Sequence, residues 1–292
     1  MQKSVRVKSF ELFAQDIAEV DVELLHALST GVGWPHRAAD WDFLRSVGKG
    51  IAAIDGIGRV FGSAMWFPHG EDFATVGLVI TTPRAQAHGT GRWMMKQVMD
   101  RCASRDLSLN STKPAYPLYV SLGFVKEATV SMWQGIAGPD PALLPPLASE
   151  TAEISEGLLV EIAELDAPAF GVRRAKLLEA LSHDAKLRVL RRGGALVGYA
   201  MCRKFGRGDL IGPIVAASDG DAIDLVAPIL ADLRGSFVRI DTREPQGAFV
   251  EFLKQSGFKI TETATTMSKG RTILNRISGA PWIYGLAGHA LS

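Results

Sequence analysis

The feature that most constrains this chain is an internal repeat with a period near 135 residues. Four pairs of landmarks align the two halves at almost one offset: Met65 with Met201, Gly77 with Gly212, Phe124 with Phe258, and Met132 with Met267. A single coincidence of this kind is weak evidence. Four pairs whose register drifts by only one or two positions indicate the duplication of one α/β unit.

The order of patterns within the first copy predicts helices packed on a mixed sheet. Apolar residues recur at helical spacing over residues 15–28 and 92–102. Between them lie two β-rich runs, residues 60–67 and 73–81, which flank a turn, and a short strand (107–110) and a short helix (117–122) complete the copy. We therefore expect the fold class to be α/β (mixed α+β), with two tandem domains, each a mixed, mostly antiparallel twisted sheet flanked by helices.

A proline-rich stretch separates the two copies. Pro139, Pro141, Pro145 and Pro146 remove backbone donors and stiffen the chain, so residues 137–150 are predicted to be a linker. The first domain then spans residues 1–136 and the second residues 151–270. The remaining tail, residues 271–292, contains Trp282 and Tyr284 and is expected to pack back onto the body; no function is assigned to it.

Composition and charge exclude several classes of protein. With 32 Lys and Arg against 31 Asp and Glu, the formal charge is +1, so the global basic excess of a sequence-blind nucleic-acid binder is missing. No apolar run is long enough to span a membrane. The 2 cysteines form neither a disulfide framework nor a zinc-binding spacing. We expect a cytoplasmic protein with no metal, no nucleic-acid partner and no membrane association, and a homodimer is compatible with the sequence.

The loop over residues 82–91 has the properties of an anion-binding site. Gly89 and Gly91 allow close approach of the backbone to a ligand, and the loop opens directly into a helix N-terminus. A tight turn that uses glycine for geometry alone is the alternative interpretation. No lysine follows the glycines as a P-loop requires, and the third small residue of a dinucleotide fingerprint is missing.

Two motifs resemble the GNAT superfamily of N-acetyltransferases. The stretch from Gln86 through Gly89 to Gly91 is similar to the superfamily's Gln/Arg-x-x-Gly-x-Gly/Ala acetyl-CoA loop, and residues 118–124 (LYVSLGF) are similar to its later Leu-Tyr-x-x-Leu-Gly-Phe signature. The resemblance covers roughly residues 1–135, and the second half resembles a divergent GNAT domain of tandem proteins. It implies acetyl-CoA as co-substrate and a small-molecule primary amine as acceptor, attacked directly in a ternary complex.

The resemblance also implies which residues hold the coenzyme. The strand before the loop would pair with the pantetheine arm, and the backbone amides of the loop would hold the pyrophosphate. Asn110 would contact pantetheine or an ordered water, and a strand-terminal cap is the alternative. The expected cofactor-binding residues are Leu78, Val79, Ile80, Gln86, Ala87, His88, Gly89, Thr90, Gly91, Arg92 and Asn110.

Tyr119 matches the position of the superfamily's general acid, which protonates the departing thiolate. The alternative is an aromatic side chain that simply packs in the core, and Tyr116 lies on nearly the same helical face. The base is the least defined group. We take Glu71 as the candidate, although this residue and its neighbours His69 and Asp72 also suit a solvated turn.

A segment rich in Trp, His and Arg, residues 33–41, occupies the region that shapes the acceptor pocket in GNAT proteins. Large aromatic side chains need a place to bury, so packing is the alternative for the two tryptophans. Arg37 would suit a carboxylate-bearing acceptor, and Arg203, Lys204 and Arg207 of the second copy are further contributors, unless they form a solvated basic loop. The acceptor-site candidates are Trp34, His36, Arg37 and Trp41.

The second copy lacks these features. An offset of 135 places Gln86, Gly89 and Gly91 on Asp221, Asp224 and Val226, and carboxylates there would repel a pyrophosphate. We therefore expect one active and one degenerate domain. The sequence is also compatible with two other classes of function: an acyl-CoA sensor without turnover, and a structural dimerisation unit.

Overall fold

The computed structural model describes residues 4–7, 10–102, 104–138, 148–274, 276–277 and 279–292, so most of the predicted linker (139–147) lies outside the described residues. The strands are β1 Ser4–Val7, β2 Phe10–Asp16, β3 Lys49–Asp55, β4 Val60–His69, β5 Phe73–Thr81, β6 Asp106–Thr112, β7 Val125–Ile136, β8 Glu150–Thr151, β9 Lys186–Arg192, β10 Ala195–Phe205, β11 Gly208–Ala216, β12 Phe237–Thr242, β13 Lys259–Lys269 and β14 Trp282–Gly285. The helices are α1 Val22–Thr30, α2 Ala38–Val47, α3 Thr90–Arg101, α4 Tyr116–Ser121, α5 Glu156–Phe170, α6 Ala175–Ser182, α7 Asp219–Asp232 and α8 Ala248–Gln255.

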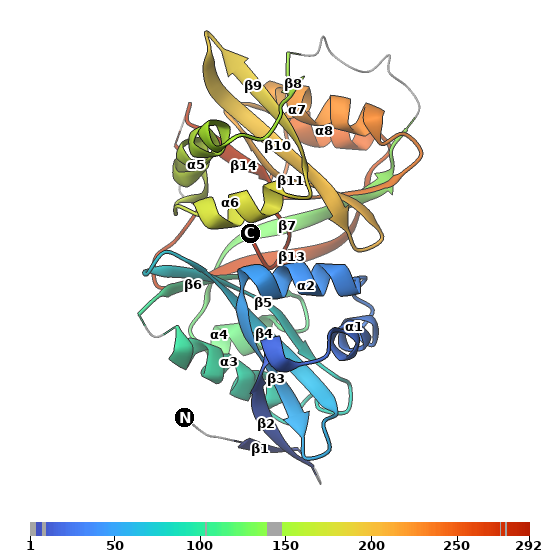
Figure 1. Cartoon of the computed structure of the whole chain (residues 1–292), viewed down its shortest axis with the longest axis vertical. Coiled ribbons are helices and arrows are strands. Elements are labelled where there is room, and N and C mark those ends of the chain that lie inside the picture. Colours follow the sequence, from blue (N-terminus) through green and yellow to red (C-terminus); the bar gives the residue numbers. More distant parts are fainter. Residues whose placement is uncertain (1–3, 8–9, 103, 139–147, 275, 278) are drawn as a thin grey trace.

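The two repeats share one mixed, mostly antiparallel sheet (Figure 1). Its strand order is β1-β2-β3-β4-β5-β6-β13-β7-β12-β11-β10-β9-β8, and β14 pairs with β11 outside this path. The last strand of each repeat is exchanged: β7 pairs with β12 of the second repeat, and β13 pairs with β6 of the first. The exchanged strands also pair with each other. The two expected sheets are therefore joined into one.

Three cores fix the helices to this sheet. The first lies under α3 and α4 of the first half and the second under α7 and α8 of the second half. The third core spans both halves, because α1, α2, α5 and α6 pack there together with the C-terminal segment; Trp41, Tyr199 and Ile283 are members. The two repeats therefore form one packed body.

The prediction of one helix over residues 15–28 is wrong at its N-terminal half. The structure extends β2 through Asp16 and begins α1 only at Val22, after a short 3₁₀ turn at Ile17–Glu19. Gln15 and Asp16 pair with β3, and the Asp21 carboxylate caps α1 by accepting from the Glu23 amide at 2.9 Å. The expected strands at 60–67 and 73–81 and the helix at 92–102 correspond to β4, β5 and α3.

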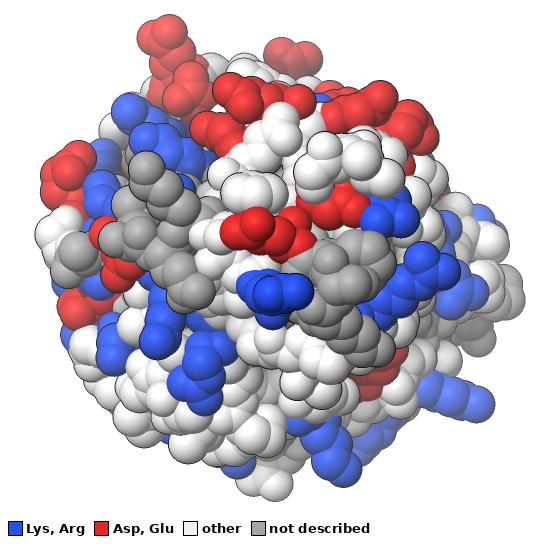
Figure 2. All heavy atoms as spheres, turned by 90° about the horizontal axis from the view of Figure 1, so that it is seen from below, with Lys and Arg blue, Asp and Glu red and all other residues white. Residues whose placement is uncertain are grey.

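Charged side chains do not form a continuous basic surface on the face seen from below. In Figure 2, basic side chains lie scattered among uncharged ones, and acidic side chains gather towards the upper edge of the view. No helix in the described part of the chain has the length and apolarity needed to cross a bilayer.

Candidate functional site

The site begins where two parallel strands separate. β5 and β6 pair from Phe73 with Asp106 to Val76 with Leu109, and no strand of the described chain pairs with residues 78–81 of β5 on that side. The register between β4 and β5 shifts at this point, and Leu78 adopts a left-handed φ of 50°. Its carbonyl accepts from the Ser63 hydroxyl of β4 at 2.7 Å. The opening leaves backbone groups of β5 available to an extended ligand.

The loop from β5 to α3 has the backbone of an anion cradle. Ala87 and Gly89 both have positive φ (61° and 81°), and Gly89 is the N-cap residue of α3. Alternation of this kind points successive amides toward one concavity. The hydroxyls of Thr82 and Thr90 are buried and have no hydrogen-bond partner among the described residues. These orphaned donors and the helix N-terminus fit a pyrophosphate at this position.

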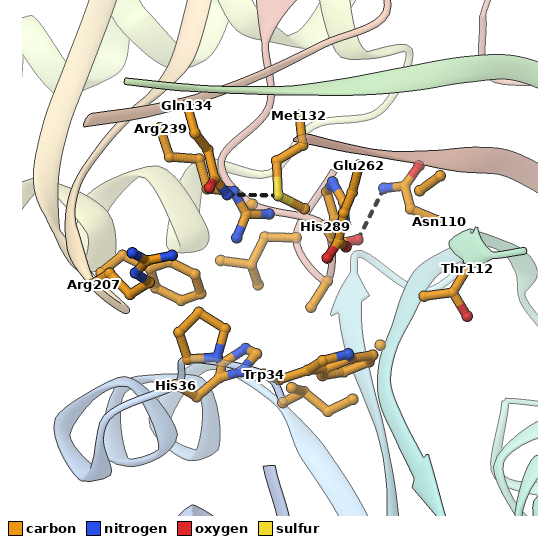
Figure 3. Close-up of a pocket in the computed structure, with 18 of the residues that line it drawn as sticks. Trp34, His36, Asn110, Thr112, Met132, Gln134, Arg207, Arg239, Glu262 and His289 are labelled. Atoms are coloured by element: carbon orange, nitrogen blue, oxygen red, sulfur yellow. Dashed lines mark hydrogen bonds between the residues drawn. The ribbon is translucent and has the colours of Figure 1, made fainter. Parts of the chain in front are cut away.

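A cavity of about 340 Å³ adjoins the opening between β5 and β6 (Figure 3). Both repeats and the C-terminal segment contribute to its walls. Arg207 lies at one end of the cavity, and Asn110, Thr112 and Glu262 lie towards the other. The lining residues with polar side chains are Trp34, His36, Asn110, Thr112, Gln134, Arg203, Arg207, Arg239, Thr261, Glu262, Thr263 and His289.

The cavity is cationic but its histidines are neutral. Burial lowers the pKa of His36 and of His289 to about 4, so neither ring is protonated at pH 7. Burial also lowers the pKa of Arg203 to about 10, which leaves its guanidinium charged. The positive charge of Arg239 is balanced by the Asp241 carboxylate, to which its guanidinium donates two hydrogen bonds of 2.8 and 2.7 Å. Arg207 is exposed, and no carboxylate of the described chain pairs with it.

Two of the four acceptor-site candidates line this cavity. Trp34 and His36 are in its wall. Trp41 is instead fully buried and donates to the Ser29 hydroxyl at 3.1 Å, which is the packing role. Arg37 is held by the Asp40 carboxylate at 2.6 Å. The structure therefore does not bring Arg37 and Trp41 into the cavity.

Glu71 lies away from the cavity. Its side chain is 99% exposed and contacts Arg105 at 3.3 Å, in the turn before β5. The strands separate at the other end of β5, so the length of that strand lies between Glu71 and the opening. Asp72, in the same turn, pairs with Arg271 at 3.0 Å. A carboxylate that faces the cavity is Glu262 of β13.

Of the two predicted residues Tyr119 and Asn110, only Asn110 lines the cavity. Tyr119, on the buried face of α4, packs in the core with its ring edge-on to Phe124 and is not among the residues that line the cavity. Burial raises its pKa well above the ordinary value. It is therefore protonated at neutral pH, as a general acid must be. Asn110 lines the cavity, donates to the main-chain oxygen of His289 at 2.9 Å and accepts from Thr266 at 2.7 Å. These contacts go to side chains and backbone more than 150 positions away.

Sequence reasoning missed Glu262, Arg239 and the residues of the C-terminal segment in this site. No local motif marks them, because they reach the cavity through strand exchange and through a tail with no periodic pattern. Arg203 and Arg207, named as contributors from the second copy, do line the cavity. Lys204 does not line the cavity and pairs with Asp209 at 2.9 Å.

The fixed offset of 135 gave a wrong alignment at the loop between β5 and α3, residues 82–89, which we call the anion loop. Eight residues, 82–89, connect β5 to α3, whereas only Ala217 and Ser218 connect β11 to α7. The whole loop is therefore absent from the second repeat. Asp221 lies in the first turn of α7 and pairs with Arg192. At the following helix the offset is 134, and Leu253 takes the place of Tyr119: the main-chain oxygen of each accepts from the amide of a phenylalanine five residues later.

Known proteins share both halves of this arrangement. Residues 24–124 match a model described as Acetyltransferase (GNAT) family, and residues 162–280 match one described as Acetyltransferase (GNAT) domain. The structure is similar to a putative acetyltransferase from Pyrococcus horikoshii, with a TM-score of 0.79, 17% identity and coverage of 100% of this chain and 99% of that one. It also resembles a tandem GNAT protein from the clavulanic acid biosynthesis pathway (TM-score 0.62, 15% identity, 90% and 100% covered).

The fold and the two matches define a tandem GNAT protein. An uncharacterized N-acetyltransferase of Bacillus subtilis, YitH, is 25% identical over 244 residues, which cover 82% of this chain and 85% of that protein. The chain belongs to the GNAT family and is an acyl-CoA-dependent N-acyltransferase.

Proposed function

We propose that the first half transfers an acetyl group from acetyl-CoA to the primary amine of a small molecule that carries an anionic group. The observation that carries this proposal is the cavity beside the opening of β5 and β6, with Arg207 at one end and Glu262 towards the other (Figure 3). A guanidinium without a carboxylate partner suits an acceptor's carboxylate, and a facing glutamate suits an ammonium group.

When bound, acetyl-CoA supplies the thioester whose C–S bond breaks as the acceptor nitrogen forms the new amide. The backbone of residues 78–80 would bind the pantetheine arm, and the amides from Ala87 to Arg92 the pyrophosphate. Glu262 would take the proton that the attacking ammonium loses, in place of Glu71. Tyr119 would give a proton to the thiolate. The backbone amide after the Leu78 bulge would stabilise the oxyanion.

A thiol-release assay with acetyl-CoA and a panel of amino acids, polyamines and aminoglycosides tests this function. We expect turnover with amines that carry a carboxylate. Arg207→Ala should raise KM for these acceptors about tenfold, the effect of losing a charge-assisted hydrogen bond, while Arg234→Ala, on an exposed surface, should leave it unchanged.

Two outcomes would contradict the proposal. A preference for polyamines would exclude the anionic acceptor. Binding of CoA without thiol release across the whole panel would make the protein an acyl-CoA sensor. Glu262→Gln tests the base separately: kcat should fall roughly 100-fold or more, and the acidic limb of the pH profile should disappear.

A further inference from the structure

The second repeat has its own separation of parallel strands. β11 and β12 pair only at Asp209 with Val238 and at Leu210 with Arg239, and then part. A bulge lies at the corresponding place, because the register between β10 and β11 shifts between Ala200 and Cys202. This opening is the structural counterpart of the one that we assign to the pantetheine arm in the first repeat.

The chain's own C-terminal segment fills this second opening. β14 pairs with β11 from Ile214 to Ala216, beyond the point where β12 departs. The Leu286 amide then donates to the Asp241 carbonyl of β12 at 2.9 Å. The segment is therefore hydrogen-bonded to both separated strands, as an inserted strand is.

Side chains fix the segment there. Trp282 donates to the Glu244 carboxylate at 2.7 Å, and the Tyr284 hydroxyl donates to Asp219 at the start of α7 at 2.9 Å. All six residues from 282 to 287 are at least nine-tenths buried. A Cβ on Gly212 would overlap the Leu286 carbonyl. A coenzyme arm cannot enter without displacing this whole strand.

The same segment continues to the first opening. Gly77 is the repeat counterpart of Gly212, and a Cβ there would overlap Ala290. The main-chain oxygen of Ala287 accepts from Arg203 at 2.9 Å, and that of His289 accepts from Asn110. Residues 288–291 consequently form one wall of the acceptor cavity. One stretch of chain thus fills one opening and borders the other.

We propose that residues 282–287 permanently occupy the coenzyme groove of the second repeat, so that each chain binds one CoA, and that this anchoring holds residues 288–291 as the wall of the acceptor cavity. The missing anion loop supports the first part, because Ser218 caps α7 with its own side chain and acidic residues occupy the first turn. The second part rests on the proposed function.

Isothermal titration of the full chain with CoA tests the stoichiometry. We expect one site per chain. Gly91 and Gly220 are both the second residue of their helices, and a side chain fits at either, since a Cβ would meet nothing closer than 3.4 Å. Gly91→Glu should weaken binding about tenfold or more through like-charge repulsion, whereas Gly220→Glu should change neither affinity nor stoichiometry.

Two sites per chain, or loss of the one site in Gly220→Glu, would overturn the proposal. No binding at all would overturn the proposed function instead, and amide hydrogen exchange then tests the anchoring without CoA. Residues 282–286 should exchange as slowly as the core strands, and rapid exchange would show that the groove is open.

The wall is tested by Tyr284→Phe, which removes a hydroxyl far from the acceptor. We expect faster exchange over residues 282–291 and an acceptor KM raised about threefold, with kcat and the Kd for CoA unchanged. Unchanged exchange, or faster exchange with an unaltered KM, would contradict the positioning role.

Discussion

The side-chain amide of Asn110 donates to the main-chain oxygen of His289 at 2.9 Å across 179 positions of sequence. This bond joins the end of β6 to the tail that borders the cavity. Asn110→Asp keeps the shape and the oxygen that accepts from Thr266, but replaces the donor by a second acceptor. We expect acceptor KM to rise about tenfold and stability to fall by about 1–3 kcal/mol.

Steady-state kinetics with a varied acceptor and urea unfolding measure these two effects. Thr266→Val removes the partner of the Asn110 side-chain oxygen and also the acceptor of the buried Arg243 guanidinium at 2.8 Å, so it should lower stability too. It is the control for the acceptor and should leave KM for the acceptor nearly unchanged. Equal KM values for Asn110→Asp and the native chain would show that the bond does not position the tail.

Tyr119→Phe tests the general acid. Because the burial of Tyr119 keeps its hydroxyl protonated, it can give a proton to the leaving thiolate. We expect kcat to fall roughly 100-fold, with the Kd for CoA unchanged. Tyr116→Phe on the same helix is the control: loss of activity there, with Tyr119→Phe active, would move the role to Tyr116.

Arg174 and Asp166 form a fully buried ion pair at 2.8 Å, to which the Tyr199 hydroxyl also donates. Arg174→Met would leave the carboxylate without its cation and should lower the free energy of unfolding by about 3–5 kcal/mol. Arg173→Met, next to it, breaks only an exposed pair with Glu164 and should cost under about 1 kcal/mol. Denaturant titration measures both, and similar losses in the two variants would contradict the assignment.

Stability should fall as the solution is acidified from pH 6.5 towards pH 4. Burial lowers the pKa of His69 to about 3, and those of His36 and His289 to about 4. The unfolded chain takes up protons from pH 6.5 downwards and the folded chain does not, so each ring contributes a loss approaching about 1.4 kcal/mol per pH unit.

His69→Leu, which removes one such ring outside the cavity, should flatten the dependence of Tm on pH in this range. The control His183→Gln, which replaces an exposed histidine, should leave the dependence of Tm on pH unchanged. Identical slopes of Tm against pH for the native chain and the two variants would show that His69 takes up its proton in the folded chain as readily as in the unfolded chain.

The sequence by itself determined the duplication, the GNAT resemblance and the position of the glycine-containing loop of the first half. Each of these depends on residues that are close together in the chain, such as the glycines at a helix start or the short signature that ends at Phe124. Only the tertiary structure brought together the residues that line the cavity and placed the C-terminal segment in the second groove. Glu262 and His289 reach the cavity through an exchanged strand and a returning tail, and no local periodicity encodes such contacts. The absence from the second repeat of a loop like residues 82–89 is also visible only in the structure. An alignment with one constant offset does not detect a deletion when the neighbouring segments are longer by a similar number of residues.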